Sequence, residues 1–284
     1  MAKPLDEPLT AADLENFVAT QDDFGLELYV YSQARSQGYE ATHGGSYTDR
    51  VTGKNRQYDI RVVVHITPQL RLCLAIECKC LRTSTPLLVS RIPRVASESF
   101  NEKMQAAGKY TNASGDPVTF GSTRSARRTK LDSLYLPNLQ TGKATALVAK
   151  LGPNQYSAKD TEIFEKWSQA LASAHDFVQS SISDNAADPA PIQTIILPVL
   201  VVSDETLWVA DYAENGNLLA KPRQTESTDF FVNSRYQIGQ GDTYYSISHM
   251  HIFTKKGIAD FLIQLNPSFE SDLRHWFKGQ EGIN

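Results

Sequence analysis

The apolar run 70–81 (LRLCLAIECKCL) carries Glu77 and Lys79 near its end, and this feature constrains the fold more than any other in the chain. Its length and its content of Leu, Ile and Cys are typical of a buried β-strand, in which side chains alternate between two faces. Glu77 and Lys79 then share one face, whereas Ile76 and Cys78 share the other. Burial of charged groups costs free energy unless partners compensate them. The run therefore predicts a strand with a polar site on one face.

A second carboxylate is expected beside that strand. Residues 39–66 contain two β-rich arms around the turn sequence 52–55 (TGKN), which predicts a hairpin with Asp59 on its second arm. A turn at Pro68 then leads the chain into the strand of Glu77. Asp59 and Glu77 are thus predicted on neighbouring strands, and hard carboxylate oxygens of this kind suit Mg²⁺.

Other elements follow from apolar spacing and composition. Helical spacing predicts helices over 11–37, about 95–110, 158–183 and 256–265, the first begun at Thr10 and Asp13 and open to a break at Gly25. Apolar runs predict strands over 192–203, 206–216 and 246–253. The first of these three runs is apolar almost throughout, as in a strand buried on both faces. With the strand of Glu77 and the helix 158–183, it predicts a parallel strand–helix–strand crossover.

The order of these residues resembles the core of the PD-(D/E)XK nuclease superfamily, the fold of type II restriction enzymes and of many repair and defence nucleases. The resemblance covers residues 24–80, and the matching positions are Glu27 on the helix, Asp59 on the hairpin, and Glu77-Cys78-Lys79 on the next strand. Tyr58 stands where the family has its name-giving proline. The motif itself is short, so its value comes from the helix, hairpin and apolar strand that surround it in this order.

The resemblance implies an α/β fold with a restriction-endonuclease-like core, in which helices flank a mixed central β-sheet. The whole chain, 1–284, would form a single domain. Its core would comprise about 11–81 and 158–213, with an insertion at about 82–156 and a C-terminal elaboration at 214–284.

The resemblance also implies hydrolysis of phosphodiester bonds, with Mg²⁺ as the cofactor and Mn²⁺ as its substitute. Asp59, Glu77 and the backbone carbonyl of Cys78 would bind the metal, and Glu27 would support a second metal ion. Lys79 would orient or deprotonate the attacking water, or stabilise the transition state. The expected function is therefore that of a metal-dependent endonuclease, with Asp59, Glu77, Lys79 and Glu27 as its catalytic residues.

Each of these residues also has a structural interpretation that the sequence leaves open. Glu27 fits an exposed helical glutamate paired with a basic side chain. Asp59 is alternatively an acid on the surface of the hairpin. Glu77 is alternatively the partner of Lys79 in an ion pair at the end of the strand. Arg61 shares the face of Asp59 and fits either a phosphate contact or an ion pair with that residue.

The remaining histidines and cysteines give weaker signals. His249 and His251 share one face of an expected strand, where core or surface histidines are the simpler interpretation and a metal or catalytic pair is the alternative. Cys73, Cys78 and Cys80 match no common zinc spacing, so buried structural cysteines are expected.

Basic residues are concentrated in one part of the chain, although the formal net charge is −4. Residues 1–30 hold one basic and seven acidic side chains, residues 31–150 hold 18 and 8, and residues 151–284 hold 9 and 17. Phosphate binding requires a local positive patch whatever the total charge. The candidate nucleic-acid-binding residues in the positive part are Arg61, Arg124, Arg127, Arg128 and Lys130.

Composition narrows the setting of the protein. No apolar run approaches the ~20 residues that span a bilayer, and the acidic N-terminus does not resemble a signal peptide. Three cysteines, all within 73–80, fit a reducing cytosol, so we expect a cytoplasmic protein without a membrane partner.

The expected partner is nucleic acid, DNA rather than RNA on family frequency, with a homodimer as the assembly and restriction or anti-phage defence as the context. Two alternatives are kept. One is a catalytically silent or effector-gated nucleic-acid-binding module of the same fold, and the other is a hydrolase of small phosphoesters. The residues identify neither an effector nor an activating partner.

Overall fold

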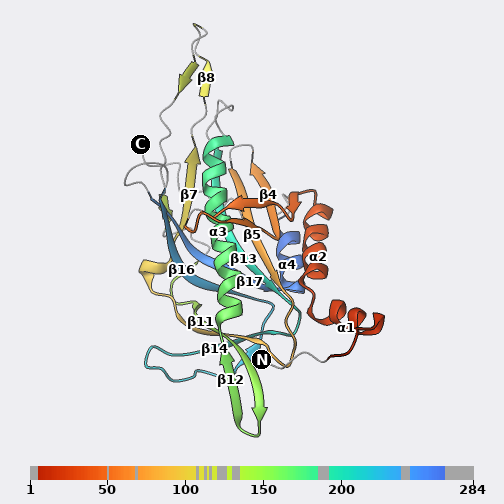
Figure 1. The fold of residues 1–284 in the computed structure, drawn as a ribbon. Coiled ribbons are helices and arrows are strands. Elements are labelled where there is room, and N and C mark those ends of the chain that lie inside the picture. The colour runs from red at the N-terminus through yellow and green to blue at the C-terminus, as the bar shows by residue number, and fades with distance from the viewer. Residues whose placement is uncertain are drawn as a thin grey trace.

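The computed structural model describes residues 6–49, 51–67, 70–106, 109–111, 114, 117–119, 127–129, 135–184, 192–237 and 244–265. Its main feature is a large mixed, largely antiparallel β-sheet with helices on both faces (Figure 1). This confirms the expected α/β class and the mixed sheet flanked by helices. The restriction-endonuclease-like core and the division of the chain stay predictions.

The first two helices are α1 (Ala11–Gln21) and α2 (Asp23–Ser36). The expected break lies at Asp22 rather than at Gly25, because Asp22 is extended (φ −83°, ψ 122°) and its side chain caps α2. Thr10 and Asp13 form a capping box at the start of α1, as expected. The break makes Asp23 the first residue of α2, which places it near the end of the strand of Glu77.

The strands are β1 (Glu40–His43), β2 (Ser46–Thr48), β3 (Asn55–Gln57), β4 (Ile60–Thr67), β5 (Leu70–Lys79), β6 (Leu87–Pro93), β7 (Asn101–Ala106), β8 (Lys109–Thr111), β9 (Pro117–Thr119), β10 (Arg127–Thr129), β11 (Gln140–Gly152), β12 (Gln155–Lys159), β13 (Ile192–Val202), β14 (Leu207–Asp211), β15 (Arg223–Gln224), β16 (Ser227–Gln237) and β17 (Tyr244–Thr254). The other helices are a 3₁₀ turn at Ala96–Glu98, α3 (Thr161–Asp184) and α4 (Lys255–Gln264). The helices expected over 158–183 and 256–265 are thus confirmed, as are the four strands expected after the hairpin.

The sheet order is β1-β4-β5-β13-β17-β16-β11-β6-β14-β15. The hairpin is confirmed, since β1 pairs antiparallel with β4, and β2 pairs antiparallel with β3 at its tip. β4 runs antiparallel to β5, with Ile60 opposite Ile76. β5 and β13 run parallel, with Glu77 opposite Leu200. The predicted parallel crossover is therefore also confirmed, and α3 directly precedes β13.

Helices cover the two faces of the sheet from opposite sides. Leu171 and Ala174 of α3 pack against Cys73 and Ala75 of β5, whereas α2 and α4 pack side by side on the other face around Ile76 (Figure 1). Because side chains alternate along β5, Glu77 and Lys79 share the face of Ala75 and point toward α3. The sheet thus positions the candidate acids beneath α3.

The predicted helix over about 95–110 is wrong. Among its described residues, this stretch forms the 3₁₀ turn at Ala96–Glu98, then β7, which pairs antiparallel with β13 and with β10, and the start of β8. Pairing with two strands satisfies the backbone groups of this segment and overrides a local helical pattern. Within the expected insertion 82–156, β6 and β11 join the main sheet. Among the residues that the structure describes, no helix is both long enough and apolar enough to cross a membrane.

Candidate active site

Asp59 and Glu77 meet on the face of the sheet that α3 covers. Asp59 directly precedes β4, and the antiparallel register of β4 with β5 brings it beside Glu77, near the end of β5. Between them lies the ammonium group of Lys166, a residue of α3. Its Nζ is 3.1 Å from Asp59 Oδ2 and 3.7 Å from Glu77 Oε2. The structure therefore brings together two of the carboxylates that the sequence singled out.

Glu77 is the most deeply buried charged group of this cluster. Its side chain is 1% exposed, and neither carboxylate oxygen has a hydrogen-bond partner among the described residues. Burial, followed by the nearby charge of Asp59, raises the pKa of Glu77 to about 9, and Lys166 offsets this only in part. A buried carboxylate without a donor is costly, so Glu77 favours its protonated form beside Asp59 unless a cation binds the pair.

Asp59 is held by the neighbouring strand. The backbone N–H of Cys78 donates to Asp59 Oδ2 at 2.8 Å, and Lys166 donates to the same oxygen. Asp59 therefore lies next to the backbone of Cys78, whose carbonyl is one of the ligands expected beside it. The role of the Cys78 carbonyl as a metal ligand stays a prediction.

Lys79 does not pair with Glu77, so the alternative of a strand-end ion pair between them is wrong. Its ammonium lies 2.6 Å from Glu162 on α3 and 3.5 Å from Asp23 on α2. Burial lowers the pKa of Lys79, but the two acids outweigh it, and the net shift is upward. The protonated form is therefore favoured, which suits an electrostatic role better than that of a general base.

Glu27 lies at the edge of the same cluster. It is 15% exposed, and its Oε2 is 2.8 Å from Nε2 of His43, so the alternative of an exposed glutamate paired with Lys or Arg is wrong. Burial raises the pKa of Glu27, and the charge of Asp59 raises it further. The role of Glu27 at a second metal ion stays a prediction.

Arg61 is engaged inside the fold. Its guanidinium is 2.9 Å from Asp176, donates to Ser173, and lies over the rings of Tyr58 and Phe177 at 4.2 and 4.6 Å. An ion pair with Asp59 is therefore wrong, because α3 supplies Asp176 instead. With 12% of its side chain exposed and its charge paired, Arg61 is poorly placed for the expected phosphate contact.

The structure does not test the contacts expected of the other candidate nucleic-acid-binding residues. Arg127 and Arg128 belong to β10, whose backbone pairs with β7. Arg124 and Lys130 lie outside the described residues. Their proposed contacts with nucleic acid stay predictions.

Sequence reasoning missed four residues that the fold adds to the cluster: Lys166, Asp23, Glu162 and His43 as a partner of Glu27. Lys166 lies four residues after Glu162 on α3, so the two share one helical face, and this spacing was the only signal for either. Asp23 also accepts a hydrogen bond from the backbone N–H of Cys80 at 2.6 Å, which holds the first residue of α2 against the residue that follows β5. Only the packing of α2 and α3 reveals these neighbours.

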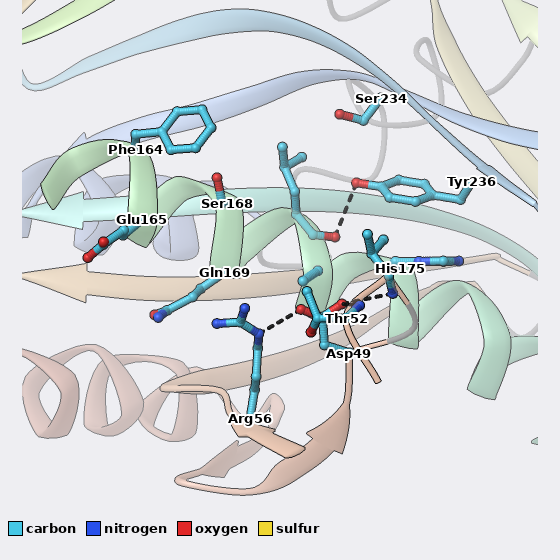
Figure 2. A pocket seen from close by; sticks show the side chains of 13 residues that line it. Asp49, Thr52, Arg56, Phe164, Glu165, Ser168, Gln169, His175, Ser234 and Tyr236 are labelled. Carbon is cyan, nitrogen blue, oxygen red and sulfur yellow. Dashed lines mark hydrogen bonds and ion pairs between the residues drawn. The ribbon is translucent and has the colours of Figure 1, made fainter. Parts of the chain in front are cut away.

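A cavity of about 700 Å³ adjoins this part of α3 (Figure 2). It lies between the β2–β3 hairpin, the exposed side of α3, and β16, and its lining includes Asp49, Arg56, Phe164, Gln169, His175 and Tyr236. Arg56 is paired with Asp49 at 2.6 Å, and Glu165, the neighbour of Lys166, also lines the space. The cavity therefore lies beside α3, and neither Asp59 nor Glu77 is among the residues that line it.

The donor set fits a divalent cation only in part. Among the described residues, no group of three or more His, Cys, Asp and Glu side chains is arranged to hold a metal ion. Glu77 and Asp59 nevertheless offer two carboxylates, one without a hydrogen bond, and Mg²⁺ commonly binds through one or two carboxylates plus waters. A cation held there would take the place of the Lys166 ammonium.

Comparison with protein-family models, with curated proteins and with solved structures gave no match to this chain.

Proposed function

We propose that the chain is a Mg²⁺-dependent nuclease of the PD-(D/E)XK type, with Asp59, Glu77 and Lys79 as its central residues. The observation that carries the proposal is the buried carboxylate of Glu77, which lacks a hydrogen bond and lies beside Asp59. A divalent cation would compensate both acids at once. The order of Glu27 on α2, the hairpin, β5, α3 and the parallel β13 supports the same proposal.

Each residue then has a part in phosphodiester hydrolysis. Asp59 and Glu77 would hold Mg²⁺, which supplies an activated water and neutralises charge on the phosphate. The N–H of Cys78 orients Asp59, and the pairing of Lys79 with Asp23 and Glu162 keeps its ammonium protonated near the site. Lys79 would therefore stabilise negative charge on the phosphate instead of removing a proton from water.

The same resemblance supports the finer parts of the proposal. DNA is the proposed substrate, a homodimer the proposed assembly, and the cytoplasm the proposed location. The positive balance of residues 31–150 supports a polyanionic partner for this part of the chain.

Cleavage of supercoiled plasmid in Mg²⁺ or Mn²⁺ tests the proposal. We expect metal-dependent nicking by the wild type and at least about a hundredfold loss in Glu77→Gln and Asp59→Asn, since each removes a charge that the metal needs. Glu214→Gln is the matched control, because Glu214 is an exposed acid outside the cluster and outside the cavity beside α3. Nicking that survives both substitutions would show that the site is wrong.

One observation favours a second candidate, a nucleic-acid-binding module without catalysis. Lys166 and Lys79 already compensate Asp59, Asp23 and Glu162 through ion pairs of 2.6–3.9 Å. A site stabilised in this way does not require a metal to fold. This candidate predicts no cleavage in any metal, together with binding to DNA that weakens steeply as salt increases.

A further inference from the structure

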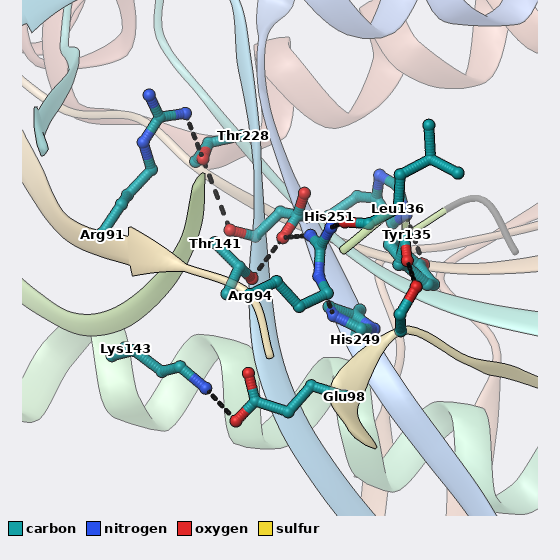
Figure 3. A network of polar contacts seen from close by, with 12 residues as sticks. Arg91, Arg94, Glu98, Tyr135, Leu136, Thr141, Lys143, Thr228, His249 and His251 are labelled. Carbon is teal, nitrogen blue, oxygen red and sulfur yellow. Dashed lines mark hydrogen bonds and ion pairs between the residues drawn. The ribbon is translucent and has the colours of Figure 1, made fainter. Parts of the chain in front are cut away.

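A network of polar side chains lies buried on the sheet face opposite the acid pair. Arg94 is 1% exposed, and it donates to Asp229 Oδ1 at 2.7 Å and to His249 Nε2 at 3.1 Å (Figure 3). Tyr135 stacks on His249 with ring centroids 3.6 Å apart, and its hydroxyl is 2.6 Å from Nε2 of His251. The proposed nuclease chemistry uses none of these groups.

The network is a costly way to fill this part of the fold. A buried ion pair such as Arg94–Asp229 adds little net stability, because desolvation offsets the attraction between the charges. Burial also keeps His249 and His251 uncharged. Apolar side chains of similar volume would serve the core as well, so this polar arrangement points to a role beyond folding.

The network opens into a cavity of about 490 Å³. Tyr135, Asp229 and His251 belong to both the network and the cavity wall. Phe253 and Phe261 add an aromatic surface, with their rings 4.9 Å apart and the ring of His251 stacked beside both. Two elements, β17 and α4, therefore build one wall of flat apolar rings beside a carboxylate.

The charges around the cavity disfavour an anion. Arg91 is the only Lys or Arg in its described lining, and it is fully engaged, with Nε and Nη2 on Asp211 and Nη1 on Thr228. Three acids also line the cavity: Asp229 pairs with Arg94 and Glu226 with Lys256, whereas Asp260 has no ion-pair or hydrogen-bond partner in the described part of the chain. A phosphate would meet these carboxylates without a free cation to bind it.

We propose that this cavity binds a small organic cation, with its charged nitrogen group facing Asp229 and Asp260 and its apolar body against Phe253 and Phe261. The carboxylates supply charge-assisted hydrogen bonds, and the aromatic faces attract a desolvated cation. The two sites lie on opposite faces of the sheet, so this inference does not depend on nuclease activity.

Isothermal titration calorimetry on the full chain tests the proposal with benzamidine, a flat amidinium, and benzoate, its anion of similar shape. We expect saturable binding of benzamidine at one site per chain and no binding of benzoate. Asp260→Asn should weaken benzamidine binding about two- to fivefold, which is the effect of removing one exposed charge partner. Asp260 is exposed, so the variant should fold.

Glu165→Gln serves as the matched control, because it removes an exposed acid outside this cavity and should leave the affinity unchanged. Phe261→Leu should also weaken binding, since it removes one aromatic face. The proposal is overturned if neither probe binds at low-millimolar concentration, if benzoate binds as well as benzamidine, or if Asp260→Asn retains the affinity of the wild type.

Discussion

Lys166 Nζ lies 3.1 Å from Asp59 Oδ2, in an ion pair that joins α3 to the start of β4. The same ammonium is 3.7 Å from Glu77 and 3.9 Å from Asp23. One lysine therefore lies among three acidic side chains, which would repel one another if all were ionised. The Mg²⁺ that we propose at Asp59 and Glu77 would have to compete with Lys166, so this lysine would weaken metal binding.

Glu77→Gln should stabilise the protein in the absence of added metal. Burial raises the pKa of Glu77 from about 4.5 to about 9, so the folded protein holds this proton more tightly than the unfolded chain does. The carboxyl therefore costs stability increasingly as pH rises from about 4.5 toward 9. At pH 7 we expect a gain of roughly 1–3 kcal/mol in the free energy of unfolding.

Urea denaturation from pH 4 to pH 9 measures this effect. The gain should vanish near pH 4 and grow with pH, whereas Glu165→Gln should show no such trend. A variant that is less stable than the wild type at pH 8 would mean that Glu77 is held by a charge partner in its ionised form.

Arg61→Met should destabilise the fold and leave cleavage unchanged. It removes the ion pair with Asp176 and the contacts with the rings of Tyr58 and Phe177, at a cost of about 2–3 kcal/mol. Arg35→Met, on the exposed side of α2, should stay within about 0.5 kcal/mol of the wild type. Urea denaturation gives the stabilities, and plasmid nicking at 25 °C gives the rates.

The opposite result for Arg61 is equally informative. Unchanged stability together with slower nicking and a weaker salt dependence of DNA binding would restore the phosphate contact that the sequence predicts for this residue.

Acid should destabilise the protein through its buried histidines. Burial lowers the pKa of His249 to about 2 and that of His251 to about 4, so these residues stay neutral where the unfolded chain takes up protons. Their contribution to stability is complete above pH 6.5 and is lost as pH falls toward 4, at up to roughly 1.4 kcal/mol per pH unit for each histidine.

His251→Gln should make the free energy of unfolding less dependent on pH between 6.5 and 4.5. His65→Gln is the control, because His65 is 48% exposed. Equal pH dependence in the wild type and His251→Gln would show that the pKa of His251 is the same in the folded and the unfolded protein.

Much of the core fold could be predicted because its signals are local. The apolar runs 70–81 and 192–203 predict β5 and β13, the second as a strand buried on both faces. The helix predicted over about 95–110 is wrong because the contacts that decide its structure are not local. The spacing of its apolar residues is that of a helix, but β7 forms its hydrogen bonds with β13 and β10, which are distant in sequence.

The sequence likewise predicts one part of the candidate site and not the other. The pairing of β4 with β5 follows from the hairpin, so the meeting of Asp59 and Glu77 could be foreseen. The partner of Lys79 could not, because Glu162 and Asp23 reach it only when α2 and α3 pack against the end of β5. Lys166 was missed for that reason too, since its place between Ile163 and Ala170 on the apolar side of α3 does not tell which carboxylates it meets.

The most direct test of the site is the binding of Mn²⁺, measured by electron paramagnetic resonance on the wild type, Glu77→Gln and Lys166→Met. Lys159→Met, which removes an exposed lysine of β12, is the control. We expect saturable binding to the wild type, loss of that binding in Glu77→Gln, and about tenfold tighter binding in Lys166→Met, because a competing cation is gone. Saturable Mn²⁺ binding that is the same in all four proteins, or absent from both the wild type and Lys166→Met, would contradict a metal site at Asp59 and Glu77.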